Sequence, residues 1–272
     1  MKDISVGIIG GTGGMGGWFA DLLRREGCVV YLAGRKRGMP QEQMATICNV
    51  VVVSVPIEVT REVIEYVGPL MRKDSLLMDL TSIKREPLEA MLEYARCEVV
   101  GCHPLFGPTI GSLAGQNVIL CPGRGTFWFS WLKALLEKNH AHVTVADAQK
   151  HDRMMSLIQV LNHLHTIHLG MVLANENVTS AELCDWSTPV FGSKLAWIRK
   201  IFLDQPSMYS EILAKNPHLD EICSQYERAW RSMEKTIGLK DPSRIIELIE
   251  QAANKLWPEI RERKKEPGVK RL

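Results

Sequence analysis

The sequence lacks a long hydrophobic run, an excess of charge of one sign, and closely spaced cysteine pairs. Its longest apolar stretches, such as residues 50–55, are far shorter than the roughly 20 residues of a membrane-spanning helix, so we expect no membrane segment. Lys and Arg number 33 against 31 Asp and Glu, and a net charge of +2 argues against binding to nucleic acid or to an anionic membrane. The seven cysteines form no C-x-x-C pair, which is typical of reduced thiols in a cytoplasmic protein.

Up to about residue 145, short β-branched runs alternate with amphipathic stretches. The expected strands are residues 4–9, 29–33, 50–55, 76–80, 99–102, 118–121 and 143–145. The expected helices between them are residues 15–26, 60–67, 87–95 and 127–138. Strands that are apolar throughout and alternate with helices predict a parallel sheet covered on both faces, which is a doubly wound α/β domain.

After residue 147 the strand patterns stop and helical spacing follows. The expected helices are residues 148–175, 180–186, 194–202, 207–214, 219–237 and 242–263, with breaks at Pro189, Gly192, Pro206, Pro217 and residues 238–242. We therefore expect two domains, an α/β domain over residues 1–147 and an all-α domain over residues 148–272, with a cleft between them. The long apolar helix needs burial on several sides, which a homodimer joined through helices would supply.

A glycine-rich loop lies between the first expected strand and the first expected helix. In the pattern G-x-G-x-x-G, the first glycine permits a tight turn, the second lets a pyrophosphate approach the backbone, and the third allows close packing of helix and strand. The helix N-terminus then offers free N–H groups to the phosphates. This context favours a dinucleotide site, and thus a Rossmann-type domain, over a purely structural turn. The expected cofactor-binding residues are Gly11, Thr12, Gly13, Gly14, Met15 and Gly16.

The end of the second expected strand indicates which dinucleotide binds. An NAD site usually has Asp or Glu about 20 residues after the loop. This sequence instead has Gly34, Arg35, Lys36 and Arg37. A small residue followed by three cations suits a 2′-phosphate, although a solvated run of charge is the alternative. The sequence therefore favours NADP as cofactor, with NAD possible.

Polar side chains also follow the later strands, where a doubly wound sheet binds its ligands. The residues at these strand ends are Ser54, Val55 and Pro56, then Thr81, Ser82 and Lys84, then His103. Pro104 and Pro108 stiffen the loop that carries His103, which makes this histidine a candidate catalytic residue, with a structural histidine as the alternative.

A histidine cluster in the helical half raises the question of a metal site. His165 and His168 could share one helical face, but His163 is turned away from it. No carboxylate or cysteine completes a ligand set at suitable spacing, so we expect no metal.

Several segments together resemble the prephenate dehydrogenase family of tyrosine biosynthesis. In the first half they are GGTGGMG (residues 10–16), SVPI (54–57), DLTSIK (79–84) and HPLFGP (103–108). In the second half they are HD (151–152), IQVLNH (158–163), NENV (175–178) and STP (187–189). The resemblance covers nearly the whole chain, in order, and looks like the dehydrogenase alone, without the fused chorismate mutase of some relatives.

The resemblance implies that prephenate and NAD(P)+ react to 4-hydroxyphenylpyruvate, CO2 and NAD(P)H. It also implies that His103 accepts a hydrogen bond from the ring hydroxyl as hydride leaves, that Ser82 orients this histidine, and that Lys84 and His163 line the substrate site. Where the family usually has an arginine for the substrate carboxylate, this sequence has Arg199 and Lys200, and the choice between them stays open. Because the imidazole must be neutral, we expect activity to fall below a pKa of about 6.5.

Three alternatives compete with this interpretation. Arogenate dehydrogenase differs only in the substrate's side chain, and the residues do not separate the two. Another two-domain reductase, dependent on NADP or F420, would explain the glycine loop but not the His103 loop together with the His163 helix. A catalytically silent dinucleotide sensor would need the fold without Ser82 and His103. The sequence thus favours a cytoplasmic, homodimeric, NADP-preferring enzyme with a Rossmann-type domain and a helical dimerisation domain.

Overall fold

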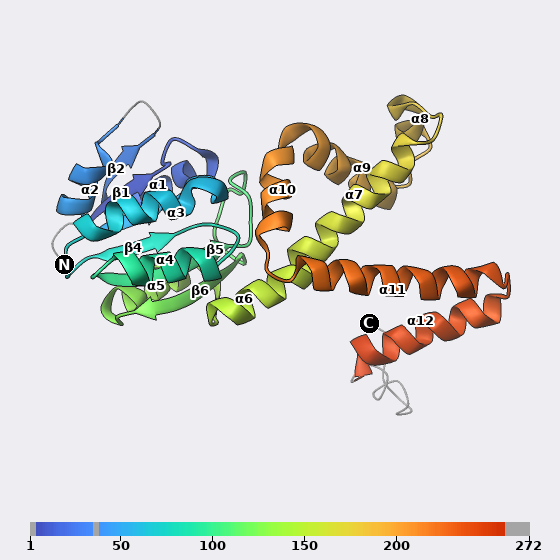
Figure 1. The fold of residues 1–272 in the computed structure, drawn as a ribbon. Helices are drawn as coiled ribbons and strands as arrows, with labels where there is room; N and C mark the ends of the chain where they lie inside the picture. Colours follow the sequence, from blue (N-terminus) through green and yellow to red (C-terminus); the bar gives the residue numbers. More distant parts are fainter. Residues whose placement is uncertain (1–3, 35–37, 259–272) are drawn as a thin grey trace, which may run out of the picture. The chain divides into compact units, whose positions relative to one another are not determined.

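The computed structural model describes residues 4–34 and 38–258, and the chain forms two compact units, residues 1–219 and 220–272 (Figure 1). The strands are β1 (Ser5–Ile9), β2 (Val29–Ala33), β3 (Val50–Val53), β4 (Leu76–Asp79), β5 (Glu98–Pro104), β6 (Asn117–Arg124) and β7 (His142–Val145). The helices among these strands are α1 (Gly14–Arg25), α2 (Gln41–Ile47), α3 (Ile57–Val67), α4 (Arg85–Tyr94) and α5 (Phe127–Lys138), with a 3₁₀ turn at Gly68–Leu70.

After β7 the described part of the chain is helical. In the first unit it forms α6 (Ala148–Met155), the π turn η2 (Ser156–Val160), α7 (Leu161–Ala174), α8 (Ser180–Asp185), α9 (Pro189–Arg199), the π turn η3 (Lys200–Asp204) and α10 (Pro206–Lys215). The helices α11 (Leu219–Gly238) and α12 (Pro242–Leu256) make up the described part of the second unit. The predicted change from an α/β half to an all-helical half is confirmed.

The seven strands form one sheet in the order β2-β1-β3-β4-β5-β6-β7. Neighbouring strands are parallel except β5 and β6, which are antiparallel. The expectation of a fully parallel sheet was therefore wrong at this pair. The chain returns from β5 to β6 through a loop rather than through a crossover helix, and only a crossover would have kept the strands parallel.

Helices cover both faces of the sheet. Successive side chains of a strand point to opposite faces, so each central strand contributes to both cores. Val50 and Val52 of β3 belong to the core beneath α1 and α5, whereas Val51 and Val53 belong to the core beneath α2, α3 and α4. All four valines are fully buried, and each such burial contributes about 1.5–3 kcal/mol relative to exposure. This explains why the strand is apolar throughout instead of alternating.

Helix α2 was not predicted, because it has only seven residues and no clear apolar stripe. Its Met44 is buried against β1, where a Cβ atom added at Gly7 would lie 2.0 Å from Met44 Cγ. Pro189 was expected to break a helix but begins α9, where a proline loses no helical hydrogen bond. Thr188 caps this helix by accepting a hydrogen bond from Phe191 N at 3.2 Å.

The chain leaves the sheet at β7 and enters one long, interrupted helix. Asp147 caps α6 by accepting a hydrogen bond from Lys150 N at 2.7 Å, and the helix then continues through η2 into α7. The prediction of a helix over residues 148–175 is thus confirmed, with a π turn in its middle. By length and composition, Ala148–Ala174 is the one helix of the described chain that could span a membrane. Its His151 and Asp152 are nevertheless buried among polar partners of the sheet domain, which places this end of the helix in the protein core.

Candidate active site

The glycine loop between β1 and α1 leaves the start of α1 open to a ligand. Gly10 has a φ of +83°, and a Cβ atom on it would lie 2.1 Å from Ser54 O. A Cβ atom on Gly16 would lie 2.5 Å from Gly10 O, so the loop can pack closely only with glycine at both positions. Among the described residues no side chain caps α1, and its first N–H groups have no intrahelical acceptor. The loop therefore fits a pyrophosphate.

A cleft of about 440 Å³ lies at this loop, where the strand order reverses between β1 and β3. Reversal points of this kind bind ligands in doubly wound sheets. The lining residues are Gly13, Gly14, Met15, Ser54, Val55, Pro56, Ile57, Glu58, Leu80, Thr81, Ser82, Ser207, Met208 and Glu211. The cleft thus contains seven of the fourteen predicted cofactor-binding residues together with Ser82, and residues of α10 form one of its edges.

The predicted selectivity residues lie only partly within the described chain. Arg35, Lys36 and Arg37 are outside the described residues. Gly34 is described, and a Cβ atom on it would lie 2.6 Å from Thr12 Oγ1. The space that an acidic side chain would need at position 34 is therefore already occupied by a residue of the glycine loop.

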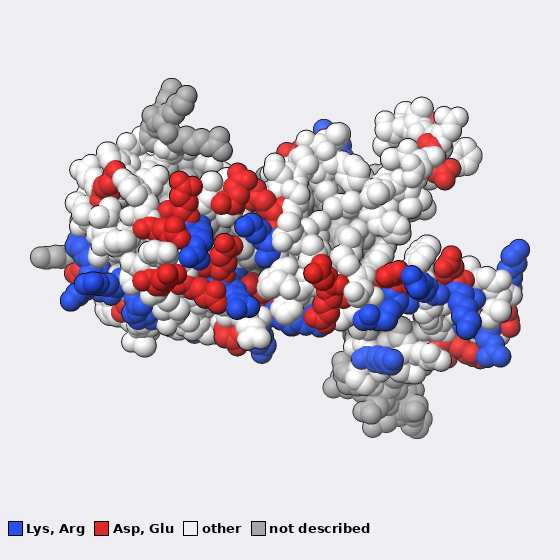
Figure 2. All heavy atoms as spheres, viewed as in Figure 1, with Lys and Arg blue, Asp and Glu red and all other residues white. Residues whose placement is uncertain are grey.

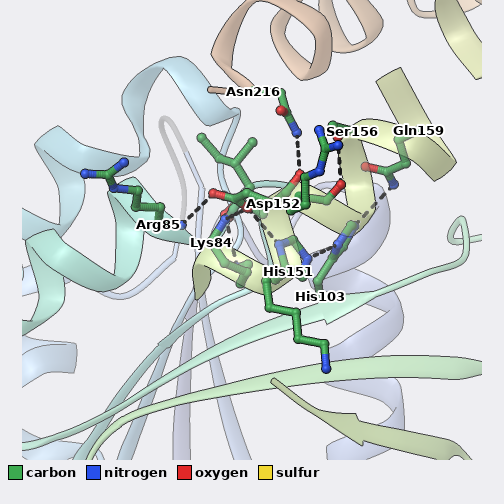
Figure 3. A network of polar contacts seen from close by, with 12 residues as sticks. Lys84, Arg85, His103, His151, Asp152, Ser156, Gln159 and Asn216 are labelled. Atoms are coloured by element: carbon green, nitrogen blue, oxygen red, sulfur yellow. Dashed lines mark hydrogen bonds and ion pairs between the residues drawn. The ribbon is translucent and has the colours of Figure 1, made fainter. Parts of the chain in front are cut away.

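His103, at the end of β5, is part of a chain of polar contacts (Figure 3). Its Nδ1 lies 2.8 Å from His151 Nε2, and His151 Nδ1 lies 2.7 Å from Asp152 Oδ1. The other ring nitrogen, His103 Nε2, lies 3.5 Å from Gln159 Nε2 of the π turn η2. His103 is only 3% exposed and does not line the cleft described above. Ser82, which was expected to orient it, is not among these contacts.

Asp152 joins this chain to the start of α4. Its Oδ1 accepts a hydrogen bond from Lys84 N at 2.8 Å, and its Oδ2 accepts one from Arg85 N at 3.0 Å. Asn216 Nδ2 also donates to the backbone carbonyl of Asp152 at 3.1 Å. Burial raises the pKa of Asp152, but the hydrogen bonds from His151 and from the two backbone amides outweigh it, so the pKa of this carboxyl lies below its usual value. The group is therefore an ionised acceptor.

The surroundings of His103 oppose its protonation. Burial contributes most, followed by electrostatic interactions with His151 and with the Lys84 ammonium, and together they hold the pKa of His103 well below 6.5. The sequence suggested a value near 6.5 because burial at this strand end could not be seen from it. The imidazole is thus neutral at physiological pH, which is the form that can accept a proton.

We expect kcat/KM to be constant around pH 7 and to fall only well below pH 6.5, because protonation removes the lone pair of His103. The unfolded chain binds this proton more readily than the native one, so stability also falls as the pH drops below 6.5. Initial rates should therefore be measured from pH 4.5 to 8, with each sample reassayed after return to pH 7.5 to separate titration from unfolding. A midpoint at or above 6.5 would contradict a neutral, buried base.

Lys84 was expected to line the substrate site, but its ammonium lies in the core. The side chain is 0% exposed and forms an ion pair with Asp79. Its Nζ also donates to Cys102 O at 3.1 Å and to Thr81 Oγ1 at 3.2 Å. A Cβ atom on Gly101 would lie 2.9 Å from Lys84 Cδ, so this glycine makes room for the lysine. In this conformation the ammonium is not available to a ligand.

The remaining predicted residues lie on the helical side. His163 is buried on α7, with its ring edge-on to Tyr209 of α10 at 4.8 Å between centroids. Burial lowers the pKa of His163, and its Nδ1 has no hydrogen-bond partner among the described residues. Lys200 Nζ lies 5.0 Å from the centre of the Trp197 ring, and Arg199 is exposed. Neither cation lines the cleft, and the described residues contain no group of three metal-binding side chains.

Sequence reasoning missed three residues of the polar chain, namely His151, Asp152 and Gln159. The first two stand at the start of a long helix, a position at which a charged pair is commonly exposed. Only the packing of α6 against α4 and the sheet brings His151 to His103, 48 residues earlier in the sequence. The available signal was their occurrence in two of the segments that carry the family resemblance.

An open glycine loop at the reversal point of a doubly wound sheet, followed by a helical half, defines a two-domain dinucleotide-binding protein. The family model for the prephenate dehydrogenase nucleotide-binding domain matches residues 19–145. The model for the prephenate dehydrogenase dimerization domain matches residues 147–251. The chain belongs to the prephenate dehydrogenase family.

Individual relatives agree with this assignment. The chain is 34% identical to a probable arogenate/prephenate dehydrogenase of Methanocaldococcus jannaschii, over 95% of this chain and 62% of the relative. It is 37% identical to the T-protein of Haemophilus influenzae, over 76% of this chain and 55% of the relative. The chain therefore matches only about three fifths of the length of these proteins.

A solved structure has the same fold. The crystal structure of prephenate dehydrogenase from Aquifex aeolicus, in complex with hydroxyphenyl propionate and NAD+, has a TM-score of 0.75 to this chain at 20% identity. The match covers 95% of this chain and 99% of that one.

Proposed function

We propose that the protein is a prephenate dehydrogenase, which converts prephenate and a nicotinamide dinucleotide to 4-hydroxyphenylpyruvate, CO2 and the reduced dinucleotide. The observation that carries the proposal is the state of His103. It is a neutral histidine at the end of a central strand. One ring nitrogen is fixed by His151, and the other lies 3.5 Å from the side-chain amide nitrogen of Gln159. Family membership supplies the substrate class.

In this reaction His103 Nε2 takes the proton of the ring hydroxyl, because loss of hydride from the same carbon makes that hydroxyl acidic. The dinucleotide supplies the hydride acceptor. Departure of CO2 returns an electron pair to the ring, and the ring oxygen takes back the proton as the phenol forms. No second base is needed. We assign Ser82, which lines the cleft, to the hydroxyl end of the substrate, and His163 to its other end.

The substrate carries two carboxylates, so its site needs cations. Lys200 and Arg199 remain the candidates, with Lys200 half-buried beside Trp197 and Arg199 exposed. For Lys84 we replace the expected contact with substrate by a role in holding the strand ends, since its ammonium is fully buried.

We infer that NADP is the preferred dinucleotide. Gly11 to Gly16 would hold the pyrophosphate, and Ser54, Val55, Pro56 and Thr81 line the same cleft beyond β3 and β4. Position 34 carries no carboxylate to repel a 2′-phosphate, and three cations follow it in the sequence. The contact that a Cβ atom on Gly34 would make with Thr12 supports this view, because an acidic side chain at position 34 would have to displace the Thr12 side chain.

We also propose a cytoplasmic homodimer formed through the helical domain, with residues 1–147 and 148–272 as the functional halves. On the face shown in Figure 2, the surface over α7, α9 and α10 carries few charged side chains. Large apolar residues are exposed in these helices or beside them, including Trp186 at 89% and Val190 and Leu203 at 71% each. Apolar surface of this kind marks a contact with another protein. The match to a dimerization domain supports a second copy as that protein.

The test is the absorbance of reduced nicotinamide with prephenate or arogenate as substrate and NADP+ or NAD+ as acceptor. We expect turnover with prephenate, and a kcat/KM at least about tenfold higher with NADP+, which corresponds to about 1.4 kcal/mol. The matched variant is Arg35→Ser, which should lower kcat/KM for NADP+ and leave that for NAD+ unchanged.

Turnover with arogenate alone would change the substrate and keep the site. Equal kcat/KM for the two dinucleotides would contradict the inference from position 34. Absence of turnover with both substrates would overturn the proposed reaction and leave a dinucleotide-binding protein.

A further inference from the structure

Asp152 is fixed as a hydrogen-bond acceptor. Both of its carboxylate oxygens receive backbone N–H groups, from Lys84 and Arg85, at the positive end of the α4 dipole. The residue is 1% exposed, so water does not compete for these bonds. An ionised carboxylate offers no proton of its own. Any ring nitrogen that contacts it must therefore carry the proton.

The tautomer of His151 follows from that contact. His151 Nδ1 lies 2.7 Å from Asp152 Oδ1 and must donate. In a neutral imidazole the other nitrogen is then an acceptor. His103 Nδ1 lies 2.8 Å from His151 Nε2, so His103 must donate in its turn. Only His103 Nε2 is left with a free lone pair.

The side-chain amide of Gln159 lies at that lone pair. Its Nε2, a donor, lies 3.5 Å from His103 Nε2, whereas its Oε1 is buried without a hydrogen-bond partner among the described residues. Donor facing acceptor agrees with a bare Nε2 on His103. The amide belongs to the π turn η2, a type of irregularity that is frequent at functional sites.

We propose that Asp152 and His151 are positioning residues that hold His103 in the Nδ1–H tautomer and so reserve its Nε2 as the base. The tautomer is a property of the protein alone, whereas its use in catalysis rests on the proposed function. Among the described residues, the charged groups that act on the two rings are Asp152 on α6 and Lys84 at the start of α4, and Lys84 is itself paired with Asp79 at the end of β4. Lys84 is paired with Asp79 and Asp152 with backbone amides, so neither competes for the His103 ring.

The direct test is nitrogen NMR of the full chain with 15N-labelled histidine at pH 8. The chain has eight histidines, and the signal of His103 is the one lost in His103→Asn. We expect His103 to be protonated at Nδ1 and bare at Nε2. A proton on Nε2 would mean that the chain of bonds runs in the opposite direction, and would overturn the proposal without the need for any variant at His151.

Two variants at His151 distinguish the relay, by which we mean the hydrogen-bond chain from Asp152 through His151 to His103, from simple packing. His151→Phe fills the space but cannot accept the His103 proton, whereas the amide oxygen of His151→Gln reaches the same place as Nε2. We expect His151→Phe to lower kcat about 10²-fold with little change in KM, because the base His103 is no longer held in one tautomer. His151→Gln should recover most of this loss, and His142→Phe, at an exposed histidine, serves as the control.

Each outcome has a distinct meaning. Wild-type kcat and an unchanged His103 tautomer in His151→Phe would overturn the relay. Equal losses in the Phe and Gln variants would reduce His151 to a packing residue and overturn it as well. If the tautomer is as expected but no substrate turns over in the wild-type protein, the proposed function fails and the relay stands.

Discussion

Replacement of His103 by alanine should lower kcat with prephenate by about 10²–10⁴-fold, which is the usual contribution of a positioned general base. The imidazole is the one group that the structure holds neutral and oriented at the end of β5. Its removal leaves the hydroxyl proton without an acceptor as hydride departs. Affinity for NADP+ should stay within about threefold of wild type, since His103 does not line the cleft at the glycine loop.

His103→Asn is the matched control for this prediction. The Asn amide can still donate to His151 Nε2 from the place of Nδ1, but it has no atom at the place of Nε2. Both variants should therefore lose turnover. The Asn variant leaves no buried nitrogen of His151 unpaired, so it should unfold at a higher temperature than the Ala variant. Turnover equal to wild type in either variant would contradict a catalytic role for His103.

The strand order explains why so much of the site was visible in the sequence. In a doubly wound sheet, functional residues follow directly after strands, so the positions of Ser82 and His103 could be found from apolar runs and their ends. The glycine loop was equally visible, because close backbone approach at Gly10 and Gly16 tolerates no side chain. Such features depend on local sequence and need no knowledge of packing.

The missed features depend on contacts between distant segments. Whether Lys84 faces a ligand or the core was decided by Asp79, which the sequence places five residues earlier but does not orient. The antiparallel return into β6 depends on where the loop after β5 leads. The sequence of this loop does not itself reveal the direction of the strand that follows. The relay through His151 requires α6 to pack beside β5. Periodicity predicts that a helix exists, but not which of its polar residues become buried.

The buried ion pair beneath the site leads to the largest expected effect on stability. We expect Lys84→Met to lower the free energy of unfolding by about 3–5 kcal/mol, because it leaves the carboxylate of Asp79 buried without its counter-charge. Asp79 Oδ2 would keep its bond from Thr81 N at 3.0 Å, but Asp79 Oδ1 already lacks a hydrogen-bond partner among the described residues. Urea unfolding followed by circular dichroism measures the loss.

Two comparisons show whether the uncompensated charge is the cause. Lys133→Met removes a solvent-exposed ion pair with Glu137 and should cost no more than about 0.5 kcal/mol. The double variant Asp79→Asn/Lys84→Met removes both charges, keeps an acceptor for Thr81, and should recover most of the stability lost in Lys84→Met. If the double variant were as unstable as Lys84→Met, the loss would come from the packing of the lysine stem against Gly101 and not from its charge. A loss below about 1 kcal/mol in Lys84→Met itself would mean that Asp79 takes up a proton or reaches water when the ammonium is absent.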